Sequence, residues 1–159
     1  LLGSTSDESS STSNTSLSLI WENYGLGINQ MSFKTTSTKK KNVIELKNYS
    51  LDLSYTLDMT KIFFLDLTAT AGVGYVFGGN GKITIASSNT KYETESVSGF
   101  GLFGLFGAEW ESIEGLIGLR YFNATYTDFN STNTSTVVSL GKPYSTSGAL
   151  LVFGLGYKF

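Results

Sequence analysis

The chain has 159 residues, enough for one domain with a substantial core, and its formal net charge is only −2. It contains no histidine and no cysteine, which disfavours zinc sites, Ser-His chemistry and any disulfide framework. Charged residues make up 15% of the chain without a long basic face, so we expect no nucleic-acid partner. The sequence shows no residues that we assign to a cofactor, a metal site or a catalytic site.

Residues 1–16 are rich in serine and threonine, which predicts a disordered tail before a single domain over residues 17–159. From Leu17 onward the sequence shows the alternation typical of β-strands, and no run has a helical period. The strands are longer than the roughly 5–6 residues usual in globular proteins. We expect six of them, at residues 17–33, 43–57, 62–77, 97–110, 113–126 and 148–159.

The predicted connections alternate in length. Residues 58–60 and 111–112 are expected to form tight hairpin turns. The other connections are long and polar, at residues 34–42, 78–96 and 127–146. Short turns at one end and long loops at the other are typical of a transmembrane barrel.

Alternation alone does not say which face of a strand is inside. In the second run, Tyr49, Leu51 and Leu53 share one face, and the opposite face carries Ser50 and Asp52. Across the runs, the polar face is mostly Gly, Ser, Thr and Asn, which fits a narrow barrel interior better than a solvated exterior. The sequence therefore predicts an all-β, antiparallel, up-and-down transmembrane β-barrel with its apolar face toward lipid.

The parity of the turns agrees with this assignment of faces. A three-residue turn at 58–60 places Leu57 opposite Lys61, and a two-residue turn pairs Trp110 with Ile113. The run at 17–33 does not alternate cleanly around Glu22 and Asn23, which suggests a β-bulge there.

Aromatic residues gather near the ends of the predicted strands. Amphipathic rings favour membrane–water boundaries, so this distribution predicts two aromatic girdles. The predicted girdle residues are Trp21, Tyr49, Tyr55, Phe63, Tyr75, Trp110, Tyr121 and Tyr157.

The last residues, Gly-Leu-Gly-Tyr-Lys-Phe, resemble the C-terminal strand of bacterial outer-membrane β-barrel proteins, which typically ends in an aromatic residue. The segments Gly-Val-Gly-Tyr (72–75) and Gly-Leu-Arg-Tyr (118–121) are similar to strands of the small barrels related to the OmpA transmembrane domain. The resemblance implies a Gram-negative outer membrane, with periplasmic turns and extracellular loops. It also implies lipid, lipopolysaccharide and the barrel-assembly machinery as partners, with Phe159 as the assembly signal.

The strand count departs from that family, whose monomeric barrels have at least eight strands. Counting residues 82–86 and 136–140 as strands would give eight, but each is too short to span a bilayer, so we expect hairpin extensions above the membrane. Unseen upstream strands, or a barrel shared by several chains as a homo-oligomer, are the remaining alternatives.

Several charged residues fall on the predicted inward face, and the turn at 58–60 would place Asp52 directly opposite Asp66. They define either a cation-binding or acid–base site or, as we favour, a polar network that fills the barrel. Lys39–Lys41 would either contact lipopolysaccharide phosphates or form a solvated loop. The predicted lumenal network is Asp52, Asp66, Glu109, Arg120 and Lys158.

These features predict a non-enzymatic outer-membrane barrel with a structural or surface-interaction role through its long loops. A pore, formed by one chain or by several chains that share a barrel, is the first alternative. A hydrolase embedded in the barrel is less expected, because barrel hydrolases rely on histidine and the chain has none.

Overall fold

The computed structural model of the chain describes residues 8–37, 41–131 and 141–157 as one antiparallel sheet. In this described part there is no helix that is long and apolar enough to cross a membrane. The strands are β1 (Glu8–Trp21), β2 (Tyr24–Ser37), β3 (Val43–Ile62), β4 (Leu65–Ile85), β5 (Thr90–Thr94), β6 (Val97–Trp110), β7 (Ile113–Tyr126), β8 (Asn130–Ser131) and β9 (Tyr144–Tyr157).

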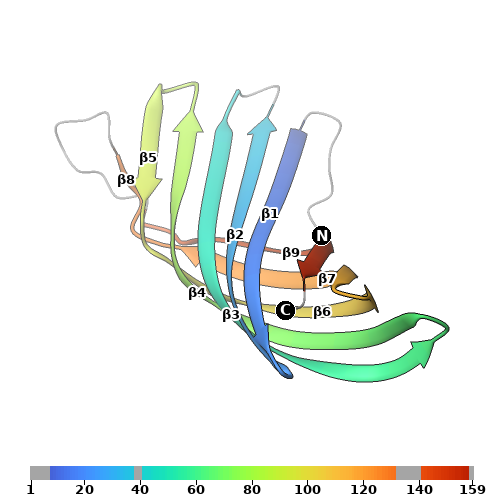
Figure 1. Cartoon of the computed structure of the whole chain (residues 1–159). Coiled ribbons are helices and arrows are strands. Elements are labelled where there is room, and N and C mark those ends of the chain that lie inside the picture. Colours follow the sequence, from blue (N-terminus) through green and yellow to red (C-terminus); the bar gives the residue numbers. More distant parts are fainter. Residues whose placement is uncertain (1–7, 38–40, 132–140, 158–159) are drawn as a thin grey trace.

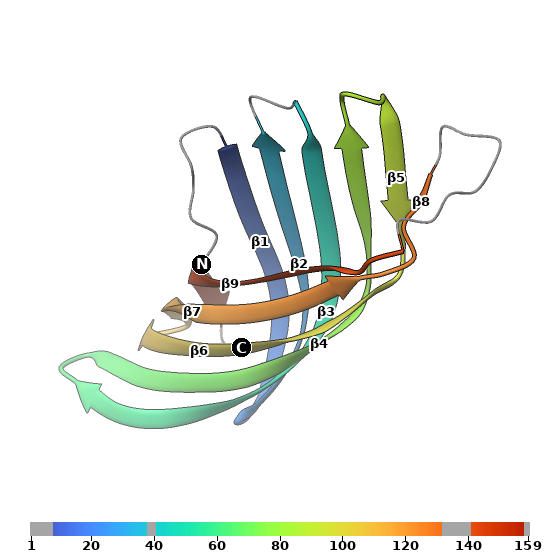
Figure 2. The ribbon, with the colours of Figure 1, turned by 180° about the vertical axis from the view of Figure 1, so that it is seen from behind.

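The sheet curls until it is nearly closed into a barrel. Its main path runs β1-β2-β3-β4-β6-β7-β9, with β5 joined to β4 and β8. In Figure 1, β1 to β4 stand side by side while β6, β7 and β9 sweep across them, and Figure 2 shows the same curl from behind. The predicted all-β, up-and-down antiparallel fold is confirmed, with seven strands on the main path instead of six.

The first predicted strand, residues 17–33, is wrong: it is two strands joined by a turn. Glu22 takes a left-handed φ of 53°, and the backbone N–H of Thr56 on β3 donates to the Asn23 carbonyl at 2.7 Å. The tail prediction is also wrong for residues 8–16, which pair residue by residue with β2 as part of β1. Residues 1–7 lie outside the described residues.

The predicted turn at 58–60 is wrong as well, because β3 continues to Ile62 and the turn is Phe63–Phe64. A register shift between Asp58 and Thr60 adds one residue to β3. Leu57 therefore pairs with Ala69 instead of Lys61. The odd-numbered residues of β3 and β4 still share one face, as predicted. A bulge of one residue plus a two-residue turn offsets the alternation by the same amount as a three-residue turn.

The segment at 82–86 extends β4 past the apolar part of the strand, as expected for a hairpin extension, and residues 82–84 also pair with β3. Residues up to Ile85 continue β4 and pair with β5, from Gly81 opposite Thr94 to Ile85 opposite Thr90. The other segment that we predicted as an extension, at 136–140, lies outside the described residues.

The C-terminal half of the sheet follows the sequence closely. β6 and β7 have the predicted bounds, and Trp110 pairs with Ile113 across the turn at 111–112. The last strand begins at Tyr144, before the predicted start at Gly148, because its first residues pair with the end of β7.

Gly118 allows β6 and β7 to approach closely. A Cβ atom at Gly118 would press on the Gly104 carbonyl oxygen and the Cα atom of Leu105, whereas one at Gly115 on the same strand would meet nothing within 4 Å. We expect Gly118→Ala to lower the free energy of unfolding by about 1–3 kcal/mol, as overpacking does. Urea unfolding in detergent measures it, and a loss of equal size in Gly115→Ala would contradict this explanation.

Candidate functional site

The outer face of the sheet carries a continuous apolar band. The side chains that point outward are strongly exposed, and the exposed fraction reaches 70% for Phe153 and 86% for Leu155. The band crosses each long strand in the part that lies nearer the short turns. It includes Leu17, Leu19, Leu26, Ile28, Leu51, Leu53, Val73, Leu102, Phe106, Ile117, Leu119 and Leu151.

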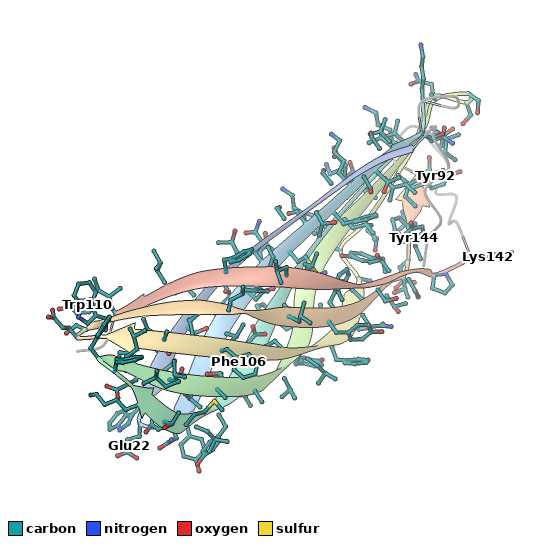
Figure 3. All side chains as sticks on the ribbon, turned by 90° about the vertical axis from the view of Figure 1, so that its right-hand side faces the viewer. Glu22, Tyr92, Phe106, Trp110, Lys142 and Tyr144 are labelled. Carbon is teal, nitrogen blue, oxygen red and sulfur yellow. The ribbon has the colours of Figure 1, made fainter. Side chains whose placement is uncertain are left out.

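Aromatic rings lie at both limits of this band. Phe64 and Trp110 form an edge-on pair at the short-turn end, with ring centroids 6.3 Å apart. Phe100 and Tyr121 pair at the same distance nearer the loops. Figure 3 shows Trp110 at the end of the molecule opposite Tyr92. The eight predicted girdle residues, Trp21, Tyr49, Tyr55, Phe63, Tyr75, Trp110, Tyr121 and Tyr157, are all exposed, and their contact with a membrane stays a prediction.

Beyond the band, toward the long loops, the polarity of the two faces reverses. Lys34, Glu45, Lys82 and Glu93 lie side by side on β2, β3, β4 and β5 and form a row of alternating charges. Lys34 contacts Glu45 at 2.6 Å and Lys82 contacts Glu93 at 3.1 Å. The hydrogen bond from Lys34 holds the pKa of Glu45 below its usual value. This part of the outer surface is therefore polar.

Under the charged row, the interior is apolar. Leu46, Ala124, Tyr126 and Phe129 are each at most 1% exposed. Burial raises the pKa of the Tyr126 hydroxyl, to which the Asn48 amide donates a hydrogen bond at 3.3 Å. The cluster joins many strands at the loop end of the interior. It packs against one partly buried residue from each of β2, β3, β4, β5, β6 and β9: Phe33, Ile44, Ile83, Tyr92, Val97 and Tyr144.

In the middle of the interior, Arg120 of β7 and Asp52 of β3 form a buried ion pair. Their side chains are 6% and 4% exposed, and the contacts are bidentate at 2.6 and 2.9 Å. Ser50 accepts from Arg120 at 3.0 Å and donates to Asp52 at 2.9 Å. The guanidinium lies 5.2 Å from the centre of the Phe103 ring. The pair links strands on opposite walls of the barrel.

Asp52 does not face Asp66 as predicted. Its cross-strand partner is Gly74, because the bulge in β3 and the longer hairpin shift the register. A Cβ atom at Gly74 would lie 2.5 Å from an Asp52 oxygen and 2.8 Å from an Arg120 nitrogen, so the glycine gives the ion pair its space.

Asp66 and Glu109 form a separate group at the short-turn end. Asp66 pairs in register with Glu109, which pairs with Glu114, and Lys61 contacts Asp66 at 3.1 Å. Asp66 and Glu109 line a cavity of about 320 Å³. Over the described residues, no three acidic side chains converge as metal ligands do. The predicted network is thus two separate groups, Asp52 with Arg120 and Asp66 with Glu109. Lys158 and Phe159, which we also predicted, lie outside the described residues.

Glu114 is an interior residue that we did not predict. It accepts a hydrogen bond from Thr68 at 2.6 Å. The alternation of β7 would have predicted it, since Glu114 lies on the same even-numbered face of the strand as Arg120.

The fold and these surfaces define a class, an antiparallel β-sheet nearly closed into a barrel with an apolar exterior and a partly polar interior. Comparison with known proteins adds no narrower identity. No protein-family model, no curated protein and no solved structure matches the chain.

Proposed function

We propose that the chain is an integral outer-membrane β-barrel protein with a structural or surface-interaction role carried by its long connections, the first two of which, at 34–42 and 78–96, largely extend β2, β4 and β5 beyond the band. The observation that carries the proposal is the apolar outer band together with the reversal of polarity beyond it. A soluble protein rarely exposes a contiguous apolar patch larger than a few hundred Å². Lipid is the solvent in which such a band is stable.

The height of the band supports this proposal. Outward apolar side chains continue from Leu67 to Phe77 on β4 and from Ile113 to Tyr121 on β7. A tilted strand needs about 9–11 residues to cross the hydrocarbon core, and both stretches have that length. The charged row that includes Lys82 begins where the apolar stretch of β4 has ended.

The side chains in the interior favour a structural role over a pore. The Leu46–Tyr126–Phe129 cluster fills the loop end, and the Asp52–Arg120 pair crosses the middle. A cavity of about 320 Å³ lies at the short-turn end. In this proposal, the outward lysines just beyond the band, Lys34, Lys47 and Lys82, would contact the phosphates of lipopolysaccharide.

Fluorescence quenching by brominated lipids tests the membrane location. The chain has two tryptophans, Trp21 and Trp110, and both lie at short turns. In lipid vesicles, Trp21→Phe and Trp110→Phe each leave one reporter. We expect bromines near the headgroups to quench either one more strongly than bromines near the bilayer centre. Fluorescence that neither lipid quenches would refute the proposal.

A further inference from the structure

The hairpin of β3 and β4 extends beyond the short turn that joins β1 to β2 (Figure 1). β2 pairs with β3 only as far as Tyr55, and the backbone N–H of Thr56 makes the last hydrogen bond on that side, to the Asn23 carbonyl. On its other side, β3 stays paired with β4 as far as Ile62. Residues 57–62 therefore form a strand edge, about 20 Å long at 3.4 Å per residue, that no described strand covers. We call it the β3 edge.

The backbone of the β3 edge is open to a partner. All of its side chains are exposed. The backbone groups of Asp58 point the same way as those of Thr56, because backbone direction alternates along a strand. Thr56 is bound to Asn23 there, whereas β2 has no residue opposite Asp58. A strand edge of this kind is a template for another strand, and extended peptides bind proteins by pairing with such edges.

The inward side of the β3 edge adjoins a cavity. Asp58 and Lys61 point into the barrel, because their partners on β4 point inward. Both line the cavity of about 320 Å³ at the short-turn end, together with Asp66 and Glu109. Lys61 contacts Asp66 at 3.1 Å, whereas the Asp58 carboxylate has no partner among the described residues.

The short-turn end is acidic as a whole. Figure 3 shows Glu22 at the same end of the molecule as Trp110. The charged residues described at this end are Glu22, Asp58, Lys61, Asp66, Glu109, Glu111 and Glu114. A surface dominated by one sign of charge attracts partners of the other sign. The other described lysines lie toward the long loops, so no described basic segment of the chain itself reaches the β3 edge.

The remaining residues of the sequence are too far away or too few to fill the β3 edge. Residues 1–7 adjoin β1 at its loop end, about 45 Å along that strand from the short turns, whereas seven extended residues span at most about 25 Å. Residues 38–40 and 132–140 join strand ends at the loop end and must return there. Residues 158–159 are too few to cover about 20 Å.

We propose that the β3 edge binds an extended basic segment of a partner protein as an added strand, antiparallel to β3. Leu57 and Ile62 point outward and favour apolar side chains on one face of that segment. On the other face, Asp58 and the acidic surroundings of the cavity favour lysine or arginine. The ligand is thus a strand in which apolar and basic residues alternate. This binding at the short-turn end goes beyond the role proposed for the long connections.

An octapeptide of alternating lysine and valine with blocked ends is the probe. Trp21 adjoins the turn beside the β3 edge, so the Trp110→Phe variant reports binding through one tryptophan. In a zwitterionic detergent, we expect the fluorescence change to saturate at one peptide per chain. A photoreactive valine at the centre of the probe, followed by mass spectrometry, should crosslink to residues 57–62.

Two control peptides separate strand addition from attraction between charges. In the first, glutamate replaces lysine, and we expect no binding because the sign of the charge is reversed. The second keeps every lysine but is N-methylated at alternate residues, which removes the backbone donors that face the edge. We expect it to bind at least about tenfold more weakly than the probe. Equal binding of the N-methylated peptide would overturn strand addition.

Two matched variants of the chain test the location. Asp58→Lys should weaken binding of the probe at least about tenfold, because like charges that face each other across a strand pair are unfavourable. Glu95→Lys makes the same change of charge at an exposed residue of the loop end and should leave binding unchanged. Equal weakening by the two variants, crosslinks only to β1 or β9, or an absence of saturable binding would each overturn the inference.

Discussion

Replacing Asp52 by asparagine is expected to lower the free energy of unfolding by about 3–5 kcal/mol. The substitution keeps the shape of the side chain but leaves the Arg120 guanidinium, only 6% exposed, without its counter-charge. No other group offsets the lost charge of Asp52, and the Nε atom of Arg120 is already buried without a hydrogen-bond partner among the described residues. Urea unfolding in lipid vesicles, followed by tryptophan fluorescence, measures the loss.

Two variants separate the buried charge from other effects. Asp66→Asn breaks an ion pair whose side chains are more than half exposed, so we expect a loss below about 1 kcal/mol. Asp52→Leu combined with Arg120→Met replaces both charges by apolar groups and should recover most of the stability. If the double variant were as unstable as Asp52→Asn, loss of the buried charge pair would not be the cause.

The turn after β3 shows why some boundaries could not be predicted. The three short turns begin at Glu22, Phe63 and Glu111, each with a left-handed φ between 53° and 56°. Glycine and asparagine are the usual residues for that conformation, and none of these positions has one. Phe63 and Phe64 lie within an apolar run that is typical of a strand interior, whereas Asp58–Thr60 has a turn-like composition.

The strand formed by residues 8–16 could not be predicted from the sequence for a different reason. These residues carry no apolar pattern, and their serines and threonines are typical of a disordered tail. In the sheet they lie beyond the apolar band, where β2 supplies the hydrogen bonds and both faces can be polar. Pairing with a neighbour is a tertiary effect that local composition does not contain.

The sequence predicts which charged residues point into the interior, but not which of them contact each other. Asp52, Asp66, Glu109 and Arg120 belong to one inward set, as the alternation of their strands indicates. Which of them meet depends on bulges, since one extra residue shifts every later pair. The Asp52–Arg120 contact also joins β3 and β7 across the barrel, a distance in sequence that alternation cannot bridge.

An arginine in the middle of the apolar band distinguishes lipid from water at that surface. Val73 lies outward on β4 between Leu53 and Leu102 and is 53% exposed. In a bilayer, Val73→Arg should lower the free energy of unfolding by about 2–4 kcal/mol, the cost of arginine near the midplane of a barrel. On a water-exposed surface the same change would alter the free energy of unfolding by no more than about 0.5 kcal/mol.

Thr84→Arg, on the outer face of the same strand beside the charged row, is the matched control and should change the free energy of unfolding little. Urea unfolding of both variants in lipid vesicles gives the comparison, and equal effects at the two positions would mean that lipid does not cover the band.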